Sequence, residues 1–411
     1  MERRVVITGI GAVTPIGNDV KTFWDNMKKG MCGIDFIKEI DTSELKVKVA
    51  GEVKNFDGEE VIGKKEIKRL DRFTQFALVA ADEAIKSSKI DLDKIDKSRF
   101  GVYVGSGMGG LSTIEKEVSK IVGENRKRLS PFFLPMSIIN LSAGNIAIKY
   151  GAKGPCISMV TACASGNNNI GEAYRAIKYG FADIMLAGGA EACITQSGIG
   201  GFDSLKTLNK SNDPKRSSIP FDKDRSGFVM GEGSGILLLE SLESALNRGA
   251  NILGEIVGYA SNCDAYHITA PDPSGEGAAE AIKLALKEAG IKPEEISYIN
   301  AHGTSTQLND LCESQAIKKV FGEYAYKIPV SSTKSMTGHL LGAAGAIEAI
   351  ACVKAINESF VPPTVNYKNK DEELDLDYVP CVGRDKELNY VLSNSLGFGG
   401  HNAMLIFKKF I

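Results

Sequence analysis

Short apolar runs rich in β-branched residues alternate along the whole chain with longer amphipathic stretches, and this alternation limits the fold more than any other feature. Runs of four or five apolar residues fit buried strands, whereas apolar residues at i, i+3, i+4 and i+7 form one face of a helix. Strands separated by helices predict an α/β layered fold. The predicted strands are 5–8, 101–104, 157–160, 184–187, 236–239, 297–300, 328–331, 390–393 and 403–407; the predicted helices include 73–87, 169–179, 277–289 and 343–357.

No Pro- or Ser-rich linker divides the 411 residues, and the polar stretches 210–227 and 271–277 are predicted to be long loops. Each half of the chain contains a strand, then a chemically reactive residue, then a helix. Lys and Arg (49) nearly balance Asp and Glu (51), so no overall field draws the chain to nucleic acid or a membrane surface. The longest aliphatic run, 236–239, is far shorter than the ~20 residues that span a bilayer.

The cysteines and histidines are dispersed, which bears on redox chemistry and on metals. The eight cysteines form no Cys-x-x-Cys pair and follow no secretory signal, so we expect reduced thiols in a cytoplasmic protein. The four histidines form no His-Glu-x-x-His motif, and the sequence therefore predicts no metal site.

Cys163 lies in Thr-Ala-Cys-Ala-Ser-Gly (161–166), at a predicted turn between a strand and a helix. Such a position near a helix N-terminus favours the thiolate through the helix dipole. The small neighbours Ala162, Ala164 and Gly166 would let a substrate approach closely, as in nucleophile elbows. Taken alone, the turn fits a nucleophile and a buried packing cysteine equally well.

Two of the histidines, His302 and His339, occupy a similar context. His302 follows the predicted strand 297–300 in Asn-Ala-His-Gly-Thr-Ser-Thr (300–306), and His339 precedes a helix of small residues in Lys-Ser-Met-Thr-Gly-His (334–339). Both are flanked by glycine at an element end, where function concentrates in α/β sheets. A helix N-terminus would keep His339 neutral, with an N–H to donate. Each histidine alone fits a structural role; two of them with a turn cysteine indicate a catalytic site.

A glycine-rich turn, Leu-Gly-Phe-Gly-Gly-His (396–401), lies between the last two predicted strands. Glycines allow a tight turn that exposes backbone N–H groups. One such group and the N–H of Cys163 could form an oxyanion hole, and Phe398 could swing as a gate. The alternative is a plain hairpin, which would not require so many glycines.

Two other motifs have simpler readings. Residues 105–110 have the G-x-G-x-x-G spacing of a dinucleotide-binding loop. Such a loop also requires an acidic residue at the end of the next strand, but here the following segment, 112–122, looks helical. The basic cluster at 63–69 fits a solvated surface by itself.

With these motifs, the chain resembles the β-ketoacyl-[acyl-carrier-protein] synthases of the thiolase superfamily, and among them synthase II. The resemblance runs from the first predicted strand through the segments at 161–166, 302–306 and 334–339 to the turn at 397–400. The combination of Cys163, His302 and His339 is that of elongating synthases; thiolases use Cys-His-Cys, and initiating synthases use Cys-His-Asn. The family fold is a five-layered αβαβα arrangement of two similar halves, here expected at 1–250 and 251–411, and homodimers are the family norm.

The resemblance implies that Cys163 takes an acyl chain from an acyl carrier protein, with the N–H groups of Cys163 and Phe398 holding the oxyanion. His302 and His339 would then donate hydrogen bonds to the thioester oxygen of malonyl-carrier protein as it loses carbon dioxide. The resulting carbanion would attack the acyl group and lengthen the chain by two carbons. Lys334 is expected to orient His339 and Glu348 instead of acting as a base. No metal or redox cofactor is expected, since phosphopantetheine arrives on the carrier protein.

Further positions follow from the resemblance with their expected roles. Thr304 and Thr306 match residues that bind the phosphopantetheine arm, and Asp264, His267 and Gly399 match positions around the approach to the site. Met108 and Phe202 match acyl-pocket positions. The positions that match the basic surface for the acidic carrier protein are Lys64, Lys65, Lys68, Arg69 and Lys206.

The chain departs from the family pattern at Gln307, where proline is usual, at Ser226, where aspartate is common, and at Leu396, where phenylalanine is common. Without the proline, we expect a less rigid loop around Thr306. Met108 stands where isoleucine is frequent, and its flexibility predicts that long chains are admitted. The other readings are a stand-alone polyketide ketosynthase, which shares these motifs, and a non-catalytic ketosynthase partner, which typically lacks the cysteine.

Overall fold

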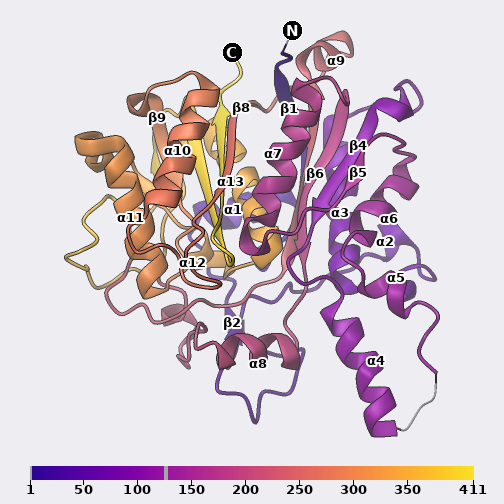
Figure 1. Ribbon diagram of the computed structural model, residues 1–411. Helices are drawn as coiled ribbons and strands as arrows, with labels where there is room; N and C mark the ends of the chain where they lie inside the picture. The colour runs from indigo at the N-terminus through magenta and orange to yellow at the C-terminus, as the bar shows by residue number, and fades with distance from the viewer. Residues whose placement is uncertain (1, 125–127) are drawn as a thin grey trace.

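The computed structural model describes residues 2–124 and 128–411, in which ten strands form one mixed sheet (Figure 1). The order across the sheet is β10-β9-β13-β14-β8-β1-β7-β6-β4-β5. The strands are β1 (Val5–Val13), β4 (Phe100–Gly105), β5 (Cys156–Ile157), β6 (Ile184–Glu191), β7 (Gly233–Ser241), β8 (Gly254–Cys263), β9 (Ile296–Asn300), β10 (Val330–Ser331), β13 (Tyr390–Gly397) and β14 (His401–Lys408).

The sheet consists of two five-stranded halves with the same connectivity. In the first half β4 runs parallel to β5 and β6, and β7 is antiparallel to β6 and β1. In the second half β9 runs parallel to β10 and β13, and β14 is antiparallel to β13 and β8. The halves join where Val5–Ile7 of β1 pair with 254–256 of β8. The weak repeat seen in the sequence is therefore a repeat of topology.

Five layers result because two helices lie between the halves. Helices α7 (Ser165–Lys178) and α13 (Ala344–Glu358) contact each other and strands of both halves. Helices α3 (Arg72–Ser88) and α6 (Leu141–Tyr150) cover the outer face of the first half, and α10 (Glu276–Ala289) packs on the outer face of the second half, with α11 (Gln307–Phe321) beside it (Figure 1). The predicted αβαβα arrangement is confirmed.

Glycines at Gly9 and Gly11 explain why β1 is longer than the predicted strand 5–8. A Cβ on Gly9 would lie 2.1 Å from the carbonyl oxygen of Ala84, and one on Gly11 would lie 1.9 Å from that of Ala80. The glycines let α3 lie directly on β1, so the strand continues to Val13. Strand β8 was missed, and of the predicted strand 157–160 only Ile157 lies in a strand, the two-residue β5.

The remaining elements are short or peripheral. The predicted loop 210–227 contains only a 3-10 turn, Pro214–Arg216, and the loop at 271 ends where α10 begins at Glu276. No helix in 2–124 or 128–411 is long and apolar enough to cross a membrane. The other elements are α1 (Val20–Lys28), β2 (Asp35–Phe36), β3 (Val49–Ala50), α2 (Glu59–Ile62), α4 (Leu111–Glu124), α5 (Phe133–Ser137), α8 (Gln196–Ser204), α9 (Leu242–Asn247), α12 (Lys334–Thr337), β11 (Phe360–Val361) and β12 (Arg384–Asp385).

Candidate active site

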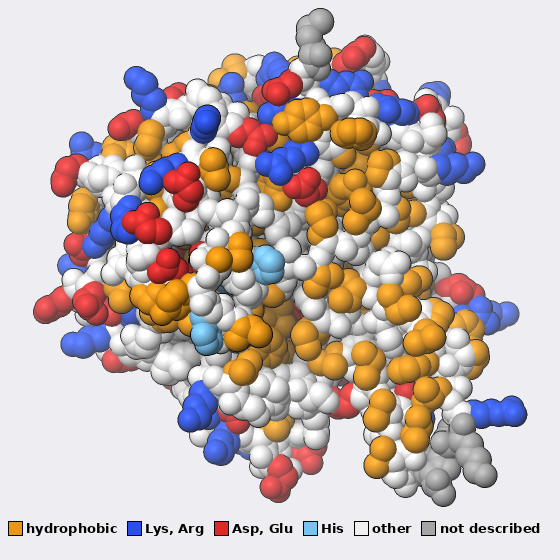
Figure 2. Space-filling view, viewed as in Figure 1, with side chains coloured by type: hydrophobic (Ala, Val, Ile, Leu, Met, Phe, Trp, Pro, Cys, Tyr) orange, Lys and Arg blue, Asp and Glu red, His pale blue; other side chains and the backbone are white. Residues whose placement is uncertain are grey.

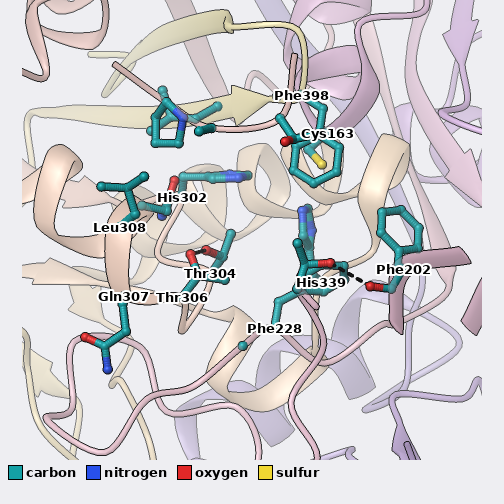
Figure 3. Close-up of a pocket in the computed structure, with 18 of the residues that line it drawn as sticks. Cys163, Phe202, Phe228, His302, Thr304, Thr306, Gln307, Leu308, His339 and Phe398 are labelled. Carbon is teal, nitrogen blue, oxygen red and sulfur yellow. Dashed lines mark hydrogen bonds between the residues drawn. The ribbon is translucent and has the colours of Figure 1, made fainter. Parts of the chain in front are cut away.

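The three predicted catalytic residues meet in one cavity of about 360 Å³ (Figure 3). Cys163 comes from the turn before α7, His302 from the segment after β9, and His339 from the loop between α12 and α13. Residues 251–411 thus supply both histidines, and the first half supplies the cysteine. Phe202, Phe228 and Phe398 line the same cavity and make much of its wall apolar.

The Cys163 turn is held in a strained conformation by side-chain hydrogen bonds. Ala162 has φ of 50°, a left-handed value that a residue with a Cβ adopts at a cost. The Ser165 hydroxyl accepts from the N–H of Thr161 at 2.9 Å and donates to the carbonyl oxygen of Ala162 at 2.7 Å. Asn168 donates to the Thr161 hydroxyl at 2.6 Å. These contacts fix the turn that presents the thiol to the cavity.

Burial raises the pKa of the Cys163 thiol to about 12, and the charge of Glu191 adds to the rise. Lys334 and the backbone N–H groups of Phe398 and of Cys163 itself pull the pKa down, but by less. This rise runs against the predicted thiolate, because desolvation disfavours the charged form. The two N–H groups that act on the sulfur are the pair expected to form an oxyanion hole.

His339 is fixed as a neutral donor by its own loop. Its Nδ1 accepts from the N–H of Leu341 at 3.2 Å, which leaves the ring proton on Nε2. Its backbone is held by the segment 229–231 just before β7, because its N–H donates to Val229 at 2.7 Å and its carbonyl accepts from Gly231 at 2.8 Å. Burial and the charge of Lys334 hold the pKa of His339 well below its usual value. The expected neutral imidazole has these two causes.

His302 is fixed in the same tautomer by Lys334. The ammonium of Lys334 lies 3.3 Å from Nδ1 of His302 and donates to the His302 carbonyl at 2.6 Å. Since an ammonium has only donors, Nδ1 accepts and Nε2 carries the proton. Lys334 also forms an ion pair with Glu348, and both side chains are buried. Lys334 therefore contacts His302 and Glu348, and its expected role in orienting His339 stays a prediction.

The two imidazoles are adjacent, with ring centroids 5.2 Å apart and planes nearly perpendicular. Burial, Lys334 and His339 hold the pKa of His302 well below its usual value. Glu313 braces the His302 segment, accepting from the N–H groups of His302 and Gly303, each at 2.8 Å. The cavity thus contains a thiol and two neutral Nε2–H donors, an arrangement that can form a thioester and stabilise an enolate.

The Phe398 turn connects β13 and β14 and is tied to the loop after β8. Gly399 (φ 85°) and Gly400 (φ 74°) have left-handed conformations. The N–H of Gly399 donates to Ile268 at 2.7 Å, and the carbonyl of Gly400 accepts from Asp264 at 2.9 Å. Phe398 lies near Phe202, with ring centroids 6.2 Å apart. The turn therefore moves only if these backbone contacts break.

Thr304 and Thr306 line the cavity and hydrogen-bond each other, with their hydroxyl oxygens 2.9 Å apart. Gln307, the first residue of α11, also lines the cavity. Its side chain donates to the carbonyl of Arg225, and the Arg225 guanidinium donates to the Gln307 carbonyl at 3.2 Å. These two hydrogen bonds restrain the segment where the family proline is missing.

Some predicted residues lie outside the cavity wall. Met108 is 40% exposed, and His267 is exposed with its Nδ1 accepting from the N–H groups of Thr269 and Ala270. Gly399 is not among the residues that line the cavity, whereas Phe202, Asp264 and Lys206 line it. The acyl-pocket and approach roles of the outlying residues stay predictions. The predicted docking residues Lys64, Lys65, Lys68 and Arg69 are exposed on the segment before α3, and so is Glu66.

Several residues of the site were missed from the sequence. Phe228 packs edge-on against His339 at 5.4 Å between ring centroids, and Asn402 lines the cavity. Glu191 and Glu313 are buried carboxylates without a short-range motif that marks them. An acidic residue inside an apolar strand, as in 184–191, is the one signal that could have singled out Glu191. Within 2–124 and 128–411, His, Cys, Asp and Glu form no group of three or more that could hold a metal ion.

Comparison with known proteins identifies the family. Residues 2–245 match the model of the β-ketoacyl synthase N-terminal domain, and residues 253–368 match that of the C-terminal domain. A 3-oxoacyl-[acyl-carrier-protein] synthase 2 of Staphylococcus aureus (strain COL) is 53% identical over 408 residues, 99% of each chain.

Two solved structures superimpose over the whole of both chains. A β-ketoacyl synthase from Burkholderia phymatum STM815 has a TM-score of 0.93 at 34% identity. A type II polyketide ketosynthase, solved in complex with its acyl-carrier protein and bound to the hexaketide, has a TM-score of 0.93 at 37% identity.

Proposed function

The chain belongs to the β-ketoacyl synthase family, and we infer that it is an elongating 3-oxoacyl-[acyl-carrier-protein] synthase of type 2. The observation that carries this function is the cavity in which Cys163 faces two neutral histidines, His302 and His339. Identity of 53% over nearly the full length to a 3-oxoacyl-[acyl-carrier-protein] synthase 2 favours fatty acid elongation over polyketide assembly, for which the compared ketosynthase is 37% identical. The intact Cys163 argues against a non-catalytic partner.

In the first half-reaction, Cys163 sulfur attacks the carbonyl carbon of the acyl thioester, and the pantetheine sulfur leaves. The proton lost by the Cys163 thiol ends on the pantetheine sulfur. One thiol is therefore consumed and one thiol is released. The N–H groups of Cys163 and Phe398, which both act on the Cys163 sulfur, would donate to the oxyanion in this proposal. Burial raises the pKa of the thiol and so favours loss of its proton as the bond to sulfur forms.

In the second half-reaction, malonyl thioester loses carbon dioxide, and the electron pair of the broken bond forms an enolate. Nε2–H of His302 and Nε2–H of His339 donate to the enolate oxygen. The enolate carbon attacks the acyl carbonyl, and Cys163 leaves and regains a proton from solvent. Each donor contributes about 10²–10³ in rate, the size found for single oxyanion donors. The reaction needs no resident cofactor in this proposal.

We propose that acyl carrier protein docks on basic residues around the cavity entrance. Lys206 lines the entrance, and Lys64, Lys65 and Lys68 are exposed on the segment before α3. Arg69 is already engaged, since it pairs with Glu66 and stacks over Phe132. A structural relative was solved with its acyl-carrier protein bound, which supports a macromolecular partner of this class.

We also propose a homodimer formed across the β5 edge. Apolar side chains gather over α4, α5 and α6 on the right of Figure 2 and continue to β5. A large exposed apolar patch beside a sheet edge fits a second copy of the chain, whose own β5 would continue the sheet. The exposed apolar residues are Val118, Ile121, Val122, Phe132, Leu134, Ile138, Ile148, Ile157 and Val160. A cytoplasmic location stays a prediction.

The test of this function uses intact mass spectrometry with acyl-carrier protein of several chain lengths. We expect wild-type protein to gain the mass of one acyl group, Cys163→Ala to gain none, and malonyl-carrier protein to convert the adduct into a product two carbons longer. Absence of an adduct with every chain length would contradict the proposal and favour the non-catalytic partner.

A further inference from the structure

The glycine run at 105–110, which has the spacing of a phosphate-binding loop, surrounds a carboxylate of the protein itself. Glu191, at the end of β6, is fully buried. It accepts from the N–H of Gly107 at 2.7 Å, the N–H of Met108 at 3.1 Å and the hydroxyl of Ser106 at 2.7 Å. Successive N–H groups of this kind form an anion-binding turn, and here Glu191 fills it.

The same carboxylate holds the loop that fixes His339. The N–H of Gly342 donates to Oε2 of Glu191 at 3.0 Å. The preceding residue, Leu341, donates its N–H to Nδ1 of His339 at 3.2 Å. Leu341 has φ of 48°, a left-handed value that persists only where neighbouring contacts hold it. Glu191 supplies such a contact on the next residue, and so it acts on the contact that sets the His339 tautomer.

Glycines let the two loops meet directly at Glu191. A Cβ on Gly342 would lie 2.3 Å from the backbone nitrogen of Gly107 and 2.9 Å from Oε2 of Glu191. A Cβ on Gly107 would lie 2.8 Å from the same oxygen. Neither loop can shift without moving the carboxylate or the other loop. Close packing of this kind transmits displacement because the interior has little free volume.

We propose that Glu191 is a positioning residue that sets the turn at 106–108 and the His339 ring together, so that the malonyl half-reaction depends on the acyl side of the site. The inference rests on the proposed function and adds a residue that touches neither substrate. In this proposal the glycine run has a structural role. It lets the turn at 106–108 and the loop at 341–342 both contact the buried carboxylate of Glu191.

The test separates the two half-reactions in Glu191→Gln. Acylation is followed by intact mass in a single turnover, and decarboxylation by carbon dioxide release from malonyl-carrier protein on enzyme already acylated. The amide replaces one acceptor oxygen by a donor that faces N–H groups, so the loop at 341–342 loses its anchor. We expect decarboxylation to fall at least tenfold and acylation less than threefold, with kcat lowered and KM for acyl-carrier protein little changed.

Glu240→Gln is the matched control. Glu240 is also fully buried. It lies at the opposite end of the β6–β7 pair from Glu191: Glu240 of β7 pairs with Ile184 of β6, and Glu191 of β6 pairs with Gly233 of β7. A general loss of packing would affect both variants alike, so this control should leave the ratio of the two half-reactions as in wild type.

Gly107→Ala is the second variant, and it tests the proposal if Glu191→Gln does not fold. Its added Cβ would press on the Glu191 carboxylate from the turn at 106–108. We expect it to slow decarboxylation more than acylation, although Gly107 does not line the cavity. Equal loss of both half-reactions in the folded variants, or decarboxylation within twofold of wild type, would overturn the proposal. A wild-type protein that cannot be acylated would instead contradict the proposed function.

Discussion

Lys334→Met removes the ammonium that lies between His302 and Glu348 while keeping most of the side-chain volume. In the native site Lys334 donates to the His302 carbonyl at 2.6 Å and pairs with Glu348, and both charged side chains are 2% exposed. Burial already raises the pKa of Glu348 to about 7, against the opposing effect of Lys334. Without the ammonium this pKa rises further, and Glu348 becomes protonated at neutral pH.

The expected loss of stability follows from the burial of the pair. Removing one partner of a buried ion pair costs about 3–5 kcal/mol. With an unfolding entropy of about 2.1 cal/mol/K per residue, a chain of this length should lose about 3–6 °C in Tm. The chemical effect is separate: His302 loses the donor to Nδ1, its Nε2–H is no longer fixed, and decarboxylation should fall about 10²–10³-fold. Acylation of Cys163 should fall much less.

The assay combines thermal unfolding with the two half-reactions, and the double variant Lys334→Met/Glu348→Gln is the control. Removing both charges should recover more than half of the lost Tm, because no buried carboxyl is left without its partner. It should not recover decarboxylation, since the donor to His302 is still missing. A Tm loss below about 1 °C in the single variant, or wild-type decarboxylation in the double variant, would refute this reasoning about Lys334.

Four further outcomes are expected. The rate of Cys163 alkylation by iodoacetamide should rise about tenfold per pH unit from pH 7 to at least pH 10. Burial raises the pKa of the thiol to about 12, and the thiolate fraction grows with pH below that value. A plateau near pH 8 would show a stabilised thiolate. Met108→Phe should slow elongation of long acyl chains and spare short ones, and unchanged long-chain rates would contradict the acyl-pocket role. Lys64→Glu/Lys65→Glu/Lys68→Glu should raise KM for acyl-carrier protein several-fold without changing alkylation of Cys163, whereas an unchanged KM would remove that segment from the docking surface. Ile157→Lys should convert the dimer into monomers in analytical ultracentrifugation, because it places a charge at the apolar β5 edge; a dimer that persists would place the interface elsewhere.

Local sequence pattern predicted the elements that carry the site. The predicted helices 73–87, 277–289 and 343–357 match α3, α10 and α13 within a residue or two at each end. Helices α3 and α10 have a regular apolar face, whereas α13 is apolar almost all round because it is buried between the halves. Strand β8 was missed because its exposed carboxyl end and its glycines interrupt the apolar run. The predicted strand 157–160 is largely irregular because β5 is an edge strand that pairs only over two residues.

The sequence by itself determined the alternation of strands and helices, the turn that carries Cys163, and the set of one cysteine and two histidines at element ends. These are properties of residues close together in the chain, and their spacing encodes them. The tertiary structure alone decided the protonation of the thiol, the partner of Lys334 and the position of Glu191 between two loops. Burial and contact in these cases come from segments far apart in the chain, such as Glu191 and Gly342, which are 151 residues apart. Desolvation depends on everything packed around a group.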